Sequence, residues 1–208
     1  MKLNLFFISV VVGYMFWGTL SAMACTGITL KSQNGTAVVA RTIEWGGSNL
    51  NSQYVIVPRG YSEQSFTPDG QNGMVFIARY GYVGLAVEQK EFIAEGINEA
   101  GLSAGLFYFP HYGEYEDYDK KVADSSISDF QLVSWILGKC TTLEEVKEAV
   151  ANVHIINIDS RASTVHWRFA DQTGRQLVLE IIGKETHFYE NNLGVLTNSP
   201  GFEWHLTN

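Results

Sequence analysis

The first half of the chain alternates short apolar runs with turn-forming residues. Residues 26–31 and 36–41 are rich in β-formers, and Gln33-Asn34-Gly35 separates them, which predicts a β-hairpin. That hairpin would return Arg41 toward Cys25. Residues 54–58 and 74–80 are further expected strands, and the stretch from Glu95 to Leu102 is expected to be a turn that leads into the apolar segment 103–109.

The hydrophobic period changes from two to about 3.6 in the middle of the chain. Residues 126–138 carry apolar side chains at helical spacing and predict a helix that ends at Gly138, with the stripe formed by Ile127, Phe130, Val133, Ile136 and Leu137. A second helix is expected at once, because Thr142 and Glu145 form a capping-box pattern. Its apolar stripe is Leu143, Val146, Ala149, Val150 and Val153.

Strand-like runs resume after the helix pair, at residues 154–158, 164–170, 176–182, 186–190 and 194–198. The order of strands, two helices and strands again favours an α+β layered fold. The composition, 46% hydrophobic and 13% aromatic, is that of a packed globular protein, and we expect residues 25–208 to form one domain.

The first 24 residues have the pattern of a secretory signal peptide. Lys2 is followed by an apolar run over residues 5–17, and Ala22-Met23-Ala24 is the small-residue pattern after which signal peptidase cuts. Cleavage there makes Cys25 the first residue of an exported protein, periplasmic or secreted in a bacterium, with no stable membrane span after processing. Two alternatives stay open: the leader is kept as a membrane anchor, or Cys25 carries a lipid.

Charge and motif content exclude several function classes. The net charge of −8 argues against a nucleic-acid partner, since phosphate binding needs a basic face. The acidic run Glu114, Glu116, Asp117 and Asp119 is typical of a solvated loop. The sequence has no Cys-x-x-Cys, His-Glu-x-x-His, Gly-x-Ser-x-Gly or Walker pattern, so it predicts no metal and no cofactor.

Cys25 is the residue with the clearest chemistry. An N-terminal cysteine carries a thiol nucleophile beside an α-amine that titrates at about 7.7 to 8.0, so nucleophile and base share one residue. Arg41 is either the cation that stabilises the thiolate or one partner of a surface salt bridge. Glu44 is either a carboxylate that orients the α-amine or an exposed loop side chain. A Cys25–Cys140 disulfide would disable the nucleophile; the other interpretation of Cys140 is a buried free thiol. His166 is expected to be a half-buried strand residue.

Five motifs together resemble the choloylglycine hydrolase family. They are Ala24-Cys25-Thr26-Gly27, Arg41-Thr-Ile-Glu-Trp45, Gly96-Ile-Asn-Glu-Ala-Gly-Leu102, Ala104-Gly-Leu106 and Leu196-Thr-Asn-Ser-Pro-Gly-Phe-Glu-Trp-His205. The family contains bile salt hydrolases and penicillin V acylases and belongs to the N-terminal nucleophile hydrolases. The resemblance therefore implies a four-layer αββα sandwich, incomplete at the C-terminus in this chain.

The resemblance also implies roles for individual residues. Cys25 matches the family nucleophile, Arg41 the catalytic arginine, and Glu44 a position that is Asp in many members. Asn198 matches an asparagine of the oxyanion hole, and Tyr108 matches the second oxyanion position after a shift of one residue. Trp45, Phe107 and Phe109 are expected to be walls of the substrate pocket.

The implied reaction is hydrolysis of a small amphipathic amide, with a glycine- or taurine-conjugated bile salt as the first candidate substrate and penicillin V as the alternative. Family members are commonly tetramers, so a homo-oligomer is expected. They also continue past the Asn198 motif, whereas this sequence stops directly after it. The sequence is therefore expected to be a fragment of a longer protein or an inactive truncated product.

Overall fold

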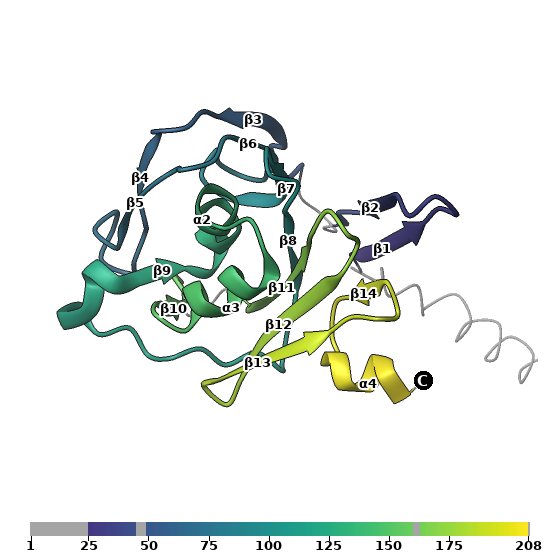
Figure 1. Cartoon of the computed structure of the whole chain (residues 1–208). Helices are drawn as coiled ribbons and strands as arrows, with labels where there is room; N and C mark the ends of the chain where they lie inside the picture. Colours follow the sequence, from purple (N-terminus) through teal and green to yellow (C-terminus); the bar gives the residue numbers. More distant parts are fainter. Residues whose placement is uncertain (1–24, 45–48, 160–162, 208) are drawn as a thin grey trace, which may run out of the picture.

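The computed structural model describes residues 25–44, 49–159 and 163–207. Its centre is a seven-stranded antiparallel sheet in the order β13-β12-β11-β8-β7-β6-β3 (Figure 1). The strands are β3 (Gln53–Val57), β6 (Tyr82–Ala86), β7 (Ile93–Asn98), β8 (Ser103–Tyr108), β11 (Val165–Ala170), β12 (Gln176–Ile182) and β13 (Glu185–Glu190).

A smaller three-stranded sheet, in the order β14-β1-β2, lies on one side of the large sheet (Figure 1). It is formed by β1 (Thr26–Lys31), β2 (Ala37–Arg41) and β14 (Val195–Thr197). The expected hairpin is confirmed: Gly35 takes a φ of +88° in the turn, and the register pairs Gly27 with Arg41.

Two helices cover the opposite side of the large sheet, namely α2 (Leu132–Lys139) and α3 (Leu143–Val150) (Figure 1). The second matches its prediction, because the Thr142 hydroxyl accepts a hydrogen bond from the Glu145 N–H at 3.1 Å and the apolar stripe is buried, except that Val153 lies beyond the helix and is half-buried. The layer order of helices, sheet and sheet agrees with the α+β expectation.

The first helix begins later than predicted. Residues Ser126–Ser128 form strand β9, which pairs in parallel with β10 (His154–Ile156), and a single 3₁₀ turn, η2 (Asp129–Gln131), precedes α2. The Ser128 hydroxyl accepts a hydrogen bond from the Phe130 N–H at 3.2 Å and so starts this turn. Ile127 therefore reaches the core from a strand, although its spacing is helical.

The stretch predicted as a turn from Glu95 to Leu102 is mostly strand. Residues 95–98 complete β7, and only the segment up to Gly101, with a φ of +83°, turns the chain. Gly96 lies in the strand because a Cβ there would be 2.7 Å from Leu137 Cδ1, so glycine lets α2 pack closely on β7. Strand β6 has no counterpart among the predicted elements.

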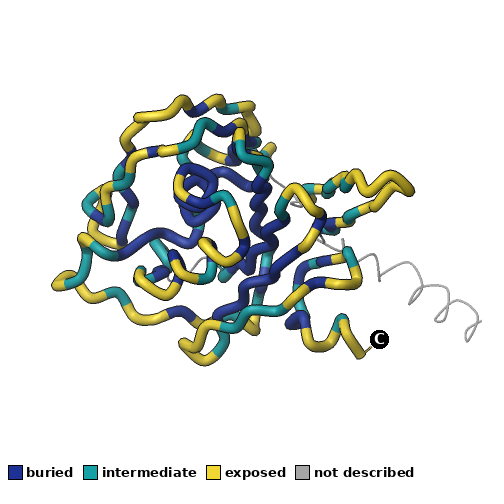
Figure 2. Tube along the Cα trace, viewed as in Figure 1, coloured by how far each residue is buried: buried dark blue, intermediate teal, exposed yellow. Residues whose placement is uncertain are grey.

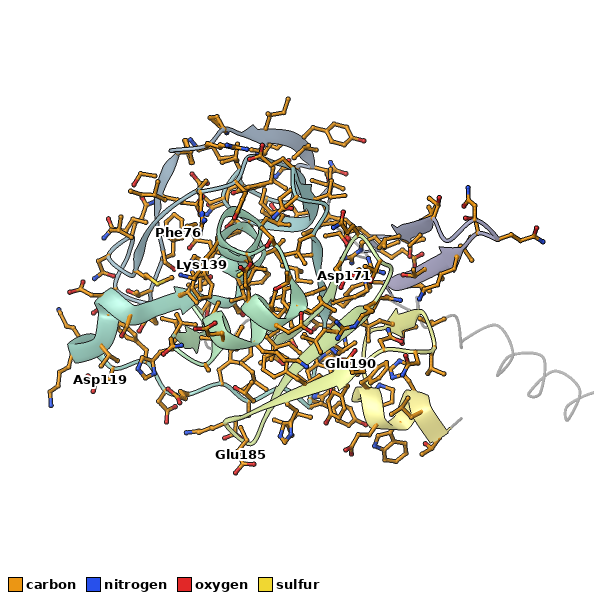
Figure 3. All side chains as sticks on the ribbon, viewed as in Figure 1. Phe76, Asp119, Lys139, Asp171, Glu185 and Glu190 are labelled. Carbon is orange, nitrogen blue, oxygen red and sulfur yellow. The ribbon has the colours of Figure 1, made fainter. Side chains whose placement is uncertain are left out.

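The remaining elements lie at the periphery. The predicted strand over residues 74–80 shrinks to β5 (Val75–Ile77), which pairs with β4 (Ser62–Gln64), and the chain also forms a 3₁₀ helix, η1 (Lys120–Ser125). Helix α4 (Phe202–Thr207), which the pattern did not predict, follows β14. The acidic loop is solvent-exposed as expected, and Asp119 projects from the rim of the molecule (Figure 3).

The buried side chains form two clusters. The larger lies between the helices and the seven-stranded sheet, and the smaller, between the two sheets, consists of Cys25, Phe107, Val178, Leu196 and Phe202 (Figure 2). On the face of the large sheet that carries the smaller cluster, three side chains on neighbouring strands form an exposed row. They are Ile56, Val83 and Ile97. Within residues 25–44, 49–159 and 163–207, no helix has the length and apolar character needed to cross a membrane.

Candidate active site

Cys25 directly precedes β1 and is only 5% exposed. Strand β1 pairs with β14 so that Thr26 lies opposite Thr197. Continuing this antiparallel register by one residue places Cys25 opposite Asn198, which is itself 7% exposed. The two ends of the described chain therefore meet at one point, as the resemblance requires of a nucleophile and an oxyanion donor.

Cys25 lines a cavity of about 340 Å³. Its polar wall residues are Arg41, Glu88, Tyr108 and Ser163, while the other walls are apolar and consist of Ile43, Leu50, Val87, Ala94, Leu106, Phe130 and Val165. Such a lining, with a few polar groups in an apolar hollow, suits an amphipathic ligand.

Arg41 is fixed in the wall of this cavity by the two central strands of the large sheet. Its side chain is 5% exposed, and Nη1 donates a hydrogen bond to the carbonyl oxygen of Ala94 at 3.2 Å and another to that of Leu106. The guanidinium also lies over the ring of Phe107, 4.0 Å from its centroid. The prediction that the hairpin brings Arg41 to Cys25 is confirmed, because both side chains line the same cavity.

Only some of the other predicted residues reach the cavity. Tyr108 lines it, whereas Glu44 is exposed beyond the end of β2 and is not among the wall residues. Phe107 and Phe109, which were expected to be pocket walls, are fully buried and are not among the wall residues of this cavity. Side chains alternate along β8, and Leu106 and Tyr108 face the cavity while Phe107 packs between the sheets. Trp45 lies outside the described residues.

His166 is fully buried rather than half-buried, which corrects the sequence-based expectation. Its Nδ1 lies 2.9 Å from Glu180 Oε1, its Nε2 lies 2.9 Å from the carbonyl oxygen of Thr197, and its ring stacks on Phe109 at 4.3 Å. Because Thr197 precedes Asn198, this imidazole fixes the end of β14 that carries the expected oxyanion donor.

Two further charged residues that lie beside Arg41 were not singled out from the sequence. Glu95 Oε1 and Arg168 Nη2 form an ion pair at 3.0 Å, in which the Arg168 side chain is buried and the Glu95 side chain is 22% exposed, and Glu95 Oε2 lies 3.6 Å from Arg41 Nη1. Burial raises the pKa of Glu95 and lowers that of Arg168, while each opposes the shift of the other. A signal for them exists in the sequence, since an arginine in the mostly apolar run from Val165 to Ala170 must find a buried partner.

Cys140 takes no part in the site. Both cysteines are free thiols, so the alternative of a Cys25–Cys140 disulfide is wrong. Cys140 lies at the C-terminal end of α2, where burial raises the pKa of its thiol to about 12. Among the described side chains, no group of three or more His, Cys, Asp or Glu residues is placed to hold a metal ion.

Comparison with known proteins agrees with the fold and the motifs. The chain is 31% identical over 192 residues to a bile salt hydrolase/transferase of Clostridium perfringens, an alignment that covers 88% of this chain and 56% of the relative. A penicillin V acylase of Pectobacterium atrosepticum is 23% identical, with 91% of this chain and 53% of the relative covered. The chain thus spans about half the length of the curated relatives it matches.

Solved structures give the same result. A variant of the conjugated bile acid hydrolase from Clostridium perfringens matches with a TM-score of 0.75 at 30% identity, over 88% of this chain and 56% of that one. The penicillin V acylase from Agrobacterium tumefaciens matches with a TM-score of 0.75 at 24% identity, over 88% of this chain and 55% of that one, and supports the fold alone. The α+β fold that the resemblance implies is thereby confirmed.

The family model described as linear amide C–N hydrolases, choloylglycine hydrolase family, matches residues 25–208. With the buried cysteine at the start of β1, the arginine that shares its cavity and the relatives named above, this match shows that the chain belongs to the choloylglycine hydrolase family.

Proposed function

We propose that the mature protein hydrolyses the C–N bond of linear, non-peptide amides, with Cys25 as the nucleophile. The observation that carries this proposal is that Cys25 and Arg41 line one mostly apolar cavity, while the register of β1 and β14 brings Asn198 opposite Cys25. A nucleophile, a buried cation and an amide donor at one point are the groups that acyl transfer needs.

The reaction follows from these groups in two balanced steps. The α-amine of Cys25 takes the thiol proton, and the sulfur attacks the acyl carbon, so that its oxygen becomes an oxyanion held by Asn198 and a second donor near Tyr108. The C–N bond then breaks, the leaving amine takes the proton from the α-ammonium, and a thioester remains. Water attacks this thioester after giving a proton to the α-amine, and the departing thiolate regains the proton as the carboxylic acid is released.

The substrate class is proposed from the relatives and from the cavity. A glycine- or taurine-conjugated bile salt joins a large apolar acyl group to an anionic amine, and a mostly apolar cavity with a few polar wall residues suits such an amphipathic molecule. The alternative is the phenoxyacetyl amide of penicillin V, which a relative of the same family is named for. Comparing the two substrates at equal concentration separates the candidates.

Processing and assembly complete the proposal. Removal of residues 1–24 frees the α-amine of Cys25 during export to the periplasm or the medium, and the mature protein forms a homo-oligomer. Intact mass and N-terminal sequencing of the exported protein test the first point. A retained leader or a lipidated Cys25 would leave no free amine and would contradict the mechanism.

The activity is tested by amine release from conjugated bile salts and from penicillin V. Cys25→Ser should reduce the rate at least a hundredfold, whereas Cys140→Ser is the matched control and should retain it, because Cys140 is buried away from the cavity. Equal rates for the wild type and Cys25→Ser would show that the thiol is not the nucleophile. A protein with a free N-terminal Cys25 that releases amine from none of these amides would contradict the proposed substrate class.

A further inference from the structure

Three neighbouring strands place a charged row under the hairpin that carries Cys25. Gly105 on β8 is paired with Glu95 on β7 and with Arg168 on β11, so the three residues lie side by side across the sheet. A Cβ at Gly105 would lie 2.0 Å from Glu95 Oε2. Glycine at this position therefore opens the space through which the Glu95 carboxylate crosses β8 to reach Arg168.

The same carboxylate connects Arg168 to Arg41. Its two oxygens face the two guanidinium groups, at 3.0 Å from Arg168 Nη2 and at 3.6 Å from Arg41 Nη1. The ring of Phe107 contacts both cations, with its centroid 4.0 Å from the Arg41 guanidinium carbon and 5.4 Å from that of Arg168. Arg168, Glu95 and Arg41 are thus one connected group, which we call the arginine–glutamate triad.

The strand that follows Cys25 rests directly on this triad. A Cβ at Gly27 would lie 2.6 Å from Arg168 Nη1 and 2.7 Å from Phe107 Cζ. Any larger residue at Gly27 would lift β1, and with it Cys25, away from the large sheet. The position of the nucleophile is therefore tied to the place of the Arg168 side chain.

The triad is costly for the fold. Arg168 is 1% exposed, and its Nη1 has no hydrogen-bond partner among the described residues. Buried ion pairs contribute little to stability when hydrophobic residues of similar volume are the alternative. With one carboxylate and two guanidinium groups, the triad instead keeps an excess of positive charge, and it holds that charge at the wall of the cavity that Cys25 lines.

We propose that Glu95 and Arg168 are positioning residues for the reaction of Cys25: they hold the Arg41 guanidinium in the cavity wall and support β1, the strand that follows the nucleophile. This inference rests on the proposed function, because it assigns the triad to the nucleophile of that reaction. Its readout, however, is the reactivity of the thiol itself, so it can be tested without a substrate.

The test is the alkylation rate of Cys25 by iodoacetamide in the processed protein at pH 7, followed by peptide mapping that separates Cys25 from Cys140. Arg168→Met removes the positive charge of the side chain but keeps most of its volume. The Glu95 carboxylate then has Arg41 as its one remaining partner in the triad. A positive charge near a sulfur nucleophile favours the negatively charged sulfur that attacks, and removing one such charge changes the rate by roughly tenfold. We expect Arg168→Met to slow alkylation about tenfold and Arg168→Lys to restore most of the rate.

Arg175→Met is the matched control, since Arg175 pairs with Glu144 at the surface and is 48% exposed in its side chain. Cys25 of this variant should be alkylated at the wild-type rate. A folded Arg168→Met protein that also reacts at the wild-type rate would overturn the proposal. Should Arg168→Met fail to fold, Arg168→Gln, which keeps a donor toward Glu95 without the charge, provides the same comparison.

Turnover distinguishes this proposal from the proposed function. Where the wild type hydrolyses an amide, Arg168→Met should lower kcat and leave KM unchanged, because the triad does not line the Cys25 cavity except through Arg41. A change in KM with no change in kcat would overturn the positioning role. A wild type that hydrolyses no amide, but whose Cys25 reactivity depends on Arg168, would refute the proposed reaction and leave the triad's role intact.

Discussion

Replacing His166 by Phe tests how the fold holds the strand that carries Asn198. The phenyl ring keeps the stacking on Phe109 but loses both polar contacts of the imidazole, at 2.9 Å to Glu180 and 2.9 Å to the Thr197 carbonyl. Both side chains of the His166–Glu180 pair are fully buried. Removing one partner of such a pair costs about 3–5 kcal/mol, because the buried Glu180 carboxylate then keeps only the hydrogen bond that the Phe202 N–H donates at 2.8 Å.

We therefore expect His166→Phe to lower the free energy of unfolding by about 4 kcal/mol, a large part of the ~5–15 kcal/mol typical of a domain. Urea unfolding followed by circular dichroism measures it. The control is His154→Phe, because His154 contacts Glu116 at 2.7 Å with side chains 41% and 54% exposed, and such a pair contributes below about 1 kcal/mol. Equal losses for the two variants would refute the reasoning.

Three other variants test the fold by the same measurement. Burial raises the pKa of Asp129 to about 7. Between about pH 4 and 7 the folded chain therefore keeps a proton on Asp129 that the unfolded chain has released. The stability that comes from holding this proton is lost as the pH rises through 7. From pH 5 to pH 8 the wild type should lose about 2 kcal/mol more than Asp129→Asn, and equal losses would contradict the shift. Gly105→Ala should cost about 1–3 kcal/mol, since its Cβ would displace Glu95, whereas Gly81→Ala, whose Cβ meets nothing nearer than 3.4 Å, should cost less than half as much. Thr142→Ala removes the N-cap of α3 and should cost about 1 kcal/mol; no loss would mean that the cap is dispensable.

The sequence predicted correctly those elements that a turn residue or a helix cap determines within a few positions. The hairpin around Gly35 and the capped helix after Thr142 are short-range features, and the structure has both. The helix expected from Ser126 failed because pairing with β10 determines residues 126–128, and that pairing is not visible in a local window. The turn expected at Glu95 failed for a similar reason, since Gly96 is a packing glycine in a strand rather than a turn residue.

In the candidate site, too, the sequence predicted what motifs and a hairpin determine and missed what the packing of the sheets determines. The family motifs and the expected hairpin predicted that Cys25 and Arg41 lie close together, and both residues line one cavity. Strand alternation alone predicts that Phe107 and Tyr108 face opposite sides, but which side faces the cavity depends on how the two sheets pack. The Glu95–Arg168 pair depends on the lateral order of β7, β8 and β11, which no spacing along the chain reveals.

The pairing of β1 with β14 also has a consequence for how the protein folds. These strands lie near opposite ends of the described chain, so closing the loop between them costs more entropy than forming the hairpins of the large sheet. An intermediate with the seven-stranded sheet complete and β14 undocked would show nearly native far-UV circular dichroism. It would still lack Asn198 opposite Cys25, so the proposed amide hydrolysis should be among the last properties to return on refolding.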